Sequence, residues 1–154
     1  FGAGRYDAAS MKPDTSSFLS TLFPRHIRVL LGVYTLASLA HFAHNAEYIA
    51  YYPNMPAWIT REGVYLAWLA IASVGLTGIV FALLSWHTAA ALCIAIYGTL
   101  GLDGLGHYAL ALCSQHSYTM NVTIWLEAAT GTVLALCALW HITPRVIRNR
   151  RVST

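Results

Sequence analysis

The chain has 154 residues, of which 57% are hydrophobic and only 10% are charged, and its mean hydropathy is +0.55. Soluble domains carry about 25% charged residues, so this composition excludes an ordinary soluble protein. The net charge of +3 comes mainly from arginines near the two ends of the chain. Such a distribution is typical of a membrane topology signal, and we expect no nucleic-acid partner.

The first segment, residues 1–24, is polar and rich in Ser, Asp and Ala. We expect it to be a flexible leader or one that lies on the membrane surface. Met11 is a candidate start of the natural chain, and residues 1–10 would then be an addition. Pro24 precedes the first apolar run and suits the opening of a helix.

Four apolar stretches follow, and each approaches the roughly 20 residues that a helix needs to cross a bilayer. They predict transmembrane helices over residues 25–48, 61–86, 88–113 and 119–142. Thr60 is a suitable N-cap for the second helix, and Pro144 should end the fourth. We therefore expect one all-α domain over residues 25–143, a four-helix transmembrane bundle, followed by a basic tail over residues 144–154.

Positive charge is placed unevenly between the two sides of this bundle. Arg25 and Arg28 precede the first span, four arginines follow the fourth, and the outer connections contain only Arg61. By the positive-inside rule both termini are cytoplasmic, which agrees with an even number of spans. This pattern predicts a multi-pass protein of a bacterial-type inner membrane or plasma membrane.

Polar residues form a stripe at the outer end of the first helix. His41, His44, Asn45 and Tyr48 follow the spacing i, i+3, i+4, i+7, which places them on one helical face. Glu47 lies at the edge of that face. Ionisable residues inside an apolar span are costly, so this stripe is a candidate functional site.

Two other helices bring ionisable residues to the same depth. Asp103 and His107 are four residues apart on the third helix, and Glu127 lies on the fourth. With a rise of about 1.5 Å per residue, His41, Asp103 and Glu127 all fall roughly 10–15 Å below the outer helix ends. The sequence therefore predicts one polar pocket in the outer half of the bundle.

Histidine and carboxylate side chains together suit zinc, iron or copper. We expect His41, His44 and His107 to supply nitrogen ligands, and Glu127 or Asp103 to complete the set or to orient a histidine. Such a centre predicts a membrane metalloenzyme, an oxidoreductase or a hydrolase, acting on a small or lipid-soluble substrate. The residues expected to support the ligands or to line the mouth of the pocket are Asn45, Glu47, Tyr48, Arg61 and Glu62.

The same residues also allow acid–base chemistry without a metal, with Glu127 and Asp103 as the catalytic groups. Ile96-Tyr97-Gly98 before Asp103 is similar to the third-helix pattern of the EXPERA-type sterol isomerases, which also place His and acidic residues in a small helical bundle. This resemblance covers a few residues in two helices. It implies an isomerase or hydrolase of a sterol-like or isoprenoid-like lipid.

Two further interpretations stay open. Histidines on facing helices can bind haem axially, although two histidines one turn apart suit a compact metal ion better. Alternatively, the polar groups satisfy one another as a buried network in a non-catalytic carrier or structural subunit. We expect His116, which lies in a connecting segment, to be solvated.

Gly98, Gly101 and Gly104 recur at intervals of three on the third helix, on the side expected to lie opposite Asp103 and His107. Small residues at such spacing allow close packing of helices. We expect this face to pack closely against another helix, and it is also a candidate homodimer contact. The other expected partners are the lipid bilayer and a hydrophobic small-molecule ligand.

Overall fold

The computed structural model describes residues 23–152, with side chains described for residues 23–141. Within that part of the chain the regular structure is entirely helical and no strand occurs. Four helical segments are long and apolar enough to cross a membrane: Arg25–Glu47, Arg61–Leu83, His87–Leu110 and Tyr118–His141. The predicted all-helical chain with four candidate spans is confirmed. The orientation of the termini stays a prediction, and the leader over residues 1–22 lies outside the described residues.

The spans are joined by short connections that contain 3₁₀ turns. In chain order the elements are α2 (Arg25–Glu47), η1 (Ile49–Tyr51), α3 (Arg61–Leu83), α4 (His87–Leu100), η2 (Asp103–Gly106), α5 (His107–Leu110), η3 (Cys113–Gln115) and α6 (Tyr118–Val152). Thr60 caps α3 as predicted, since its Oγ1 accepts a hydrogen bond from the Gly63 amide at 3.1 Å.

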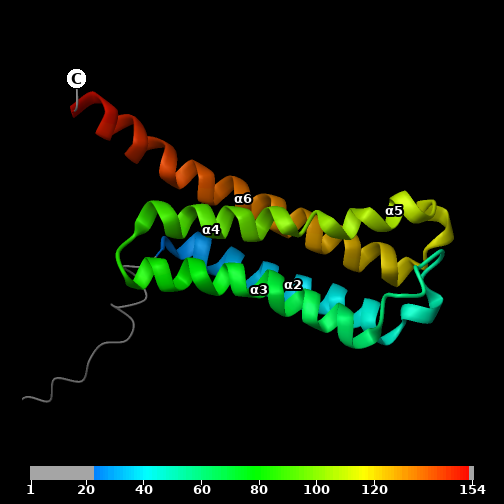
Figure 1. Cartoon of the computed structure of the whole chain (residues 1–154). Helices are drawn as coiled ribbons and strands as arrows, with labels where there is room; N and C mark the ends of the chain where they lie inside the picture. The colour runs from blue at the N-terminus through cyan, green and yellow to red at the C-terminus, as the bar shows by residue number, and fades with distance from the viewer. Residues whose placement is uncertain (1–22, 153–154) are drawn as a thin grey trace, which may run out of the picture.

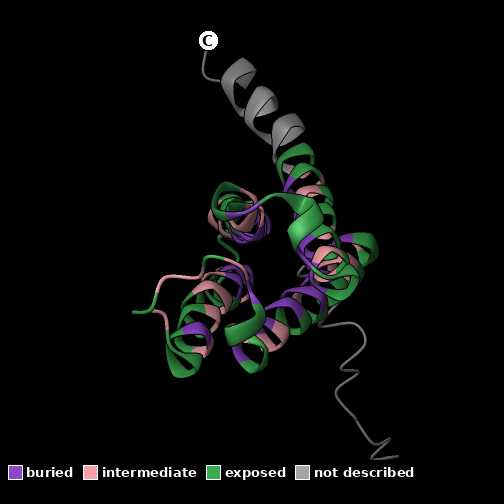
Figure 2. Cartoon of the chain, turned by 90° about the vertical axis from the view of Figure 1, so that its right-hand side faces the viewer, coloured by how far each residue is buried: buried purple, intermediate pink, exposed green. Residues whose placement is uncertain are grey.

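The helices run side by side as a bundle in which α2 packs on α3 and α6, and α4 packs on the same two helices (Figure 1). Buried residues face the interior and exposed residues face outward, as Figure 2 shows. Only 17% of the residues in the most apolar stretch of α3 are buried inside the bundle. Its outward face carries Leu66, Leu69 and Leu76, all well exposed, which suits contact with lipid.

Apolar packing is divided into two clusters along the bundle. The larger one contains Ile27, Tyr34, Ile94 and Leu134, with Tyr97 packed edge-on against Tyr34 at a ring-centroid distance of 4.7 Å. The smaller one joins the outer ends of α2 and α3 through buried apolar residues: Phe42, Ala46 and Val64. Together they hold the helix faces that carry the polar residues in register.

Helices α4 and α6 approach each other through glycine. A Cβ atom on Gly98 would lie 2.5 Å from the Gly131 carbonyl oxygen, and one on Gly131 would lie 2.4 Å from the Gly98 carbonyl oxygen. Gly101 faces Tyr34, and Gly104 faces His41 and Glu127. The predicted close packing is therefore confirmed. These three glycines of the third span are turned into their own bundle, and the homodimer contact stays a prediction.

The third span is not the continuous helix over residues 88–113 that the sequence predicted. It leaves α-helical geometry after Leu100, continues as the 3₁₀ turn η2, and resumes for one turn as α5. The glycines that follow Leu100 weaken the α-helix. Gly101 cannot be replaced by a residue with a side chain without a clash, because a Cβ atom would lie 2.9 Å from the Tyr34 hydroxyl. Asp103 is therefore in a 3₁₀ turn, not one α-helical turn from His107.

The fourth candidate span, Tyr118–His141, agrees with the predicted residues 119–142, but its helix is longer. Helix α6 continues through Pro144 to Val152 and includes most of the predicted basic tail, so the expected end of the helix before Pro144 is wrong. Proline is tolerated in membrane helices because other groups can satisfy the backbone carbonyl that it leaves free. The C-terminal part of α6 projects beyond the other helices (Figure 1).

Candidate functional site

A buried pair of ionisable side chains joins α2 to α6. His41 is 2% exposed and Glu127 is 0% exposed, and His41 Nε2 lies 3.7 Å from Glu127 Oε2. Gly104 of η2 covers the pair, since a Cβ atom there would lie 3.2 Å from Glu127 Oε2 and 3.3 Å from His41 Nε2. The predicted meeting of the first, third and fourth spans at one depth is thus observed.

His41 also contacts Thr123 through its other ring nitrogen. The Thr123 hydroxyl lies 3.0 Å from the Met120 carbonyl, to which it can donate, and 3.3 Å from His41 Nδ1. The tautomer with its proton on Nδ1 satisfies both contacts. In that tautomer Nε2 presents a lone pair to Glu127.

Around this pair several buried oxygen atoms have no hydrogen-bond partner among the described residues. They are both carboxylate oxygens of Glu127, the Ser38 hydroxyl and the Tyr34 hydroxyl. Ser38 lies next to both Tyr34 and Glu127. Buried polar groups are nearly always satisfied in native proteins, so a cluster of unsatisfied ones needs an explanation.

Further toward the outer end, three histidines surround Tyr52. The Tyr52 hydroxyl lies 3.0 Å from His44 Nδ1, and the Tyr52 ring packs against the rings of His107 at 4.8 Å and His116 at 6.4 Å between centroids. His116 is only 6% exposed, so the prediction that it is solvated is wrong.

The reason is local: the His116 ring bonds the Leu112 carbonyl at 3.0 Å and turns inward. Neither Tyr52 nor His116 was a candidate from the sequence. Both lie in connecting segments that carry no helical periodicity.

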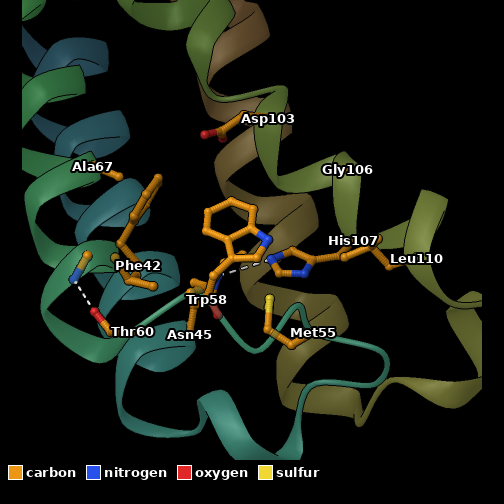
Figure 3. A pocket seen from close by; sticks show the side chains of 13 residues that line it. Phe42, Asn45, Met55, Trp58, Thr60, Ala67, Asp103, Gly106, His107 and Leu110 are labelled. Carbon is orange, nitrogen blue, oxygen red and sulfur yellow. Dashed lines mark hydrogen bonds between the residues drawn. The ribbon is translucent and has the colours of Figure 1, made fainter.

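Beside these clusters is a pocket of about 510 Å³ between α2, α3 and α5 (Figure 3). Most of its walls are apolar, and they include Phe42, Met55, Trp58, Ile59, Val64, Ala67 and Leu110. Asp103 and His107 supply its ionisable groups, and both side chains point into the pocket (Figure 3). Its size falls within the range of about 300–1,000 Å³ that is usual for small-molecule sites.

Asn45 and Asn54 hold one side of this pocket together. The Asn45 amide nitrogen lies 3.1 Å from His107 Nε2, and this contact fixes the orientation of the imidazole ring. Asn54 donates a hydrogen bond to the Leu110 carbonyl at 2.8 Å, which ties the α2–α3 connection to α5. The predicted supporting role of Asn45 therefore has a specific partner, His107.

The five residues predicted as metal ligands do not form one shell. His41 pairs with Glu127, His44 contacts Tyr52, and Asp103 lines the pocket. Within the residues with described side chains, no group of three or more His, Cys, Asp or Glu residues is placed to hold a metal ion. Glu127, predicted as catalytic, is not among the residues that line the pocket.

The other predicted residues lie near the outer end of the bundle, away from the buried pair. Glu47 accepts hydrogen bonds from Arg61 Nη2 at 2.6 Å and from the Tyr65 hydroxyl at 2.7 Å. Tyr48 stacks on His44 with ring centroids 4.7 Å apart, and Glu62 is exposed in the first turn of α3. The Glu47–Arg61 pair links the two ends of the α2–α3 connection.

Comparison with protein-family models, with curated proteins and with solved structures finds no match to this chain. The function proposed below therefore rests on the geometry of the site and on the chemistry of its residues.

Proposed function

We propose that this protein binds a lipid-soluble small molecule in the pocket between α2, α3 and α5 and transfers protons on it, as an intramembrane isomerase does. One observation carries the proposal: a pocket of about 510 Å³ with largely apolar walls has Asp103 and His107 as its ionisable groups. Apolar walls suit a hydrocarbon body, and a few convergent polar groups fix its orientation.

Asp103 is suited to accept or donate a proton within the pocket. Its carboxylate accepts a hydrogen bond from the Gly104 backbone, and no cationic side chain among residues 23–141 pairs with it. A carboxylate without a cationic partner in an apolar site is a candidate general base. His107, held by Asn45, is the second candidate acid–base group.

A double-bond shift is the reaction that these groups can complete alone. Asp103 removes a proton from an allylic carbon, the electron pair of that C–H bond forms the new double bond, and the old double bond takes a proton at its far carbon from His107 or from protonated Asp103. One proton leaves the substrate and one enters it. Atoms and electrons balance without an oxidant or a reductant.

The test combines binding with hydrogen exchange. The protein purified in detergent is incubated with a panel of sterols and isoprenoid alcohols in deuterated water, and deuterium in each recovered compound is measured by mass spectrometry. We expect at least one compound to bind and to gain deuterium. Asp103→Asn should reduce the rate of exchange at least about 100-fold while changing binding little, because removal of a positioned acid or base typically costs about 10²–10⁴ in rate.

Two further variants complete the experiment. Ala67→Phe fills the pocket from α3 and should weaken binding, whereas the same change at Ala72 on the same helix, which is not among the residues that line this pocket, is the matched control. Binding that survives Ala67→Phe unchanged would contradict the proposed pocket. Binding of a compound without any gain of deuterium would indicate that the protein is a carrier and not an isomerase.

A further inference from the structure

Behind the pocket, the unsatisfied polar atoms around Glu127 form a second site. Glu127, Ser38 and Tyr34 are each 0% exposed, and the oxygen atoms of their side chains have no hydrogen-bond partner among the described residues. His41 Nε2 lies 3.7 Å from Glu127 Oε2 and presents a lone pair there in the tautomer that has its proton on Nδ1. The Ser38 hydroxyl is close to both Tyr34 and Glu127. The group therefore gathers several electron-pair donors around one buried position.

The distance between His41 Nε2 and Glu127 Oε2 is too long for a hydrogen bond but suits two ligands of one metal ion. His41 Nε2 and Glu127 Oε2 are 3.7 Å apart, whereas N–H···O hydrogen bonds span about 2.7–3.2 Å. Zinc bonds to nitrogen or oxygen are about 2.1 Å long, so one ion can reach two atoms up to about 4.2 Å apart. At 3.7 Å the angle at such an ion would be about 125°, within the range of a distorted tetrahedron.

The backbone of η2 approaches this position without a side chain. The third span is unwound at η2, and Gly104 has no side chain where a Cβ atom would lie 3.2 Å from Glu127 Oε2 and 3.3 Å from His41 Nε2. Interrupted membrane helices are a common way to build an ion site, because they bring irregular backbone to a buried position. We propose that His41 Nε2 and the Glu127 carboxylate bind one divalent transition-metal ion of the zinc class, with the Ser38 hydroxyl and water completing its shell.

Charge balance supports a divalent ion. Glu127 supplies one negative charge directly to the ion. The Asp103 carboxylate, which is exposed but close enough to interact electrostatically with Glu127, adds a second negative charge nearby. Opposite charges together limit the cost of burying Glu127 and the ion. The imidazole nitrogen favours zinc, copper, iron or nickel over calcium and magnesium, which prefer oxygen ligands. The site differs from the five-residue set predicted from the sequence, because His44 and His107 are not ligands.

The test measures metal binding directly and needs no activity. The detergent-purified chain is stripped with a chelator, and cobalt(II) is then titrated while its visible absorption and its stoichiometry by elemental analysis are recorded. We expect about one ion per chain in a tetrahedral-type spectrum, with zinc displacing cobalt. Glu127→Gln and His41→Gln should each weaken binding at least about 100-fold, since changes to groups that only support a ligand already cost about 10–100-fold.

Gly104→Ala is the sharper variant, because it places a Cβ atom 3.2 Å and 3.3 Å from the two proposed ligand atoms, Glu127 Oε2 and His41 Nε2, and removes no ligand. It should weaken cobalt binding, whereas Gly32→Ala, where no atom lies within 4 Å of the added Cβ, should not. His44→Ala should also leave cobalt binding unchanged, because the His44 ring bonds Tyr52.

Three results would contradict the metal site. The first is that wild-type protein, shown by circular dichroism to be folded, binds neither cobalt nor zinc. The second is that His44→Ala abolishes cobalt binding, and the third is that Gly104→Ala leaves cobalt binding unchanged. Failure of the proposed pocket would be seen separately, because Ala67→Phe changes ligand binding and leaves the metal site intact.

Discussion

Tyr52 is the residue that holds the outer histidines in place. Its hydroxyl contacts His44, and its ring packs against His107 and His116. Only 3% of its surface is exposed, although it lies in a connection between spans. Burial raises the pKa of the Tyr52 phenol to about 12, because the phenolate would lose its hydration.

This raised pKa predicts how stability changes at alkaline pH. In the unfolded chain a tyrosine ionises near pH 10, while Tyr52 in the folded protein stays protonated until about pH 12. Its contribution to stability is therefore complete below about pH 10 and is lost as the pH rises toward 12. Tyr52→Phe removes this dependence, and it also costs about 1 kcal/mol through the lost hydrogen bond.

The measurement is an ultraviolet titration of tyrosinate in wild type minus Tyr52→Phe. The difference should show one phenol that ionises well above the ordinary tyrosine range. A difference curve with its midpoint near pH 10 would contradict the described burial of Tyr52. Tyr118→Phe is a matched control, because Tyr118 is 85% exposed and its phenol is therefore not buried in the fold.

At the scale of elements, the crossing of α4 and α6 sets where the site residues meet. The two helices are in contact through backbone at Gly98 and Gly131, so neither can slide along the other without a clash. The same crossing holds η2, which follows α4, over Glu127 of α6. Interhelical packing through small residues is a main source of association between membrane helices.

Gly98→Ala should therefore be strongly destabilising. The added Cβ atom would lie 2.5 Å from the Gly131 carbonyl oxygen, and backbone atoms cannot move aside as a side chain can. We expect a loss of about 1–3 kcal/mol, which is typical of overpacking, measured as a lower thermal or denaturant midpoint in detergent.

Gly32→Ala is the control for Gly98→Ala. It lies in α2 with no atom within 4 Å of the added Cβ, so it should be neutral or should stabilise by up to about 1 kcal/mol through helix propensity. Equal effects of the two substitutions would contradict the described crossing of α4 and α6.

The sequence predicted the spans and the depth of the site because periodicity and length determine both. It placed His41, Asp103 and Glu127 at one level, and the structure brings His41 and Glu127 together. It expected Gly104 to face away from the polar groups, but Gly104 lies against His41 and Glu127. It missed the break in the third span, because a run of apolar residues and glycines predicts one continuous helix. The break is related to the packing against Tyr34, which the sequence pattern does not show. His116 and Tyr52 were missed because residues outside helices have no periodic pattern to place them.

For the whole molecule, membrane orientation is the prediction that matters most for access to the site. The arginines that flank the first and last spans predict that both termini are cytoplasmic, and this orientation would place the pocket in the outer half of the membrane. Reporter fusions should show a cytoplasmic signal at each end and an external signal when inserted near Asn54. An external signal from either terminus would contradict this orientation.

The contact of His41 with Thr123 and Glu127 joins the first described span to the last, and His41 and Thr123 are 82 positions apart in the sequence. This separation has a consequence for biosynthesis. Segments leave the ribosome in order, and α2 is the least apolar of the four candidate spans, with a mean hydropathy of 1.2. The histidine stripe of α2 is therefore synthesised before its partners on η2 and α6 exist. If the four spans cross a membrane, we expect the nascent chain to keep α2 beside the insertion machinery, or exposed to water, until α6 arrives and the bundle closes.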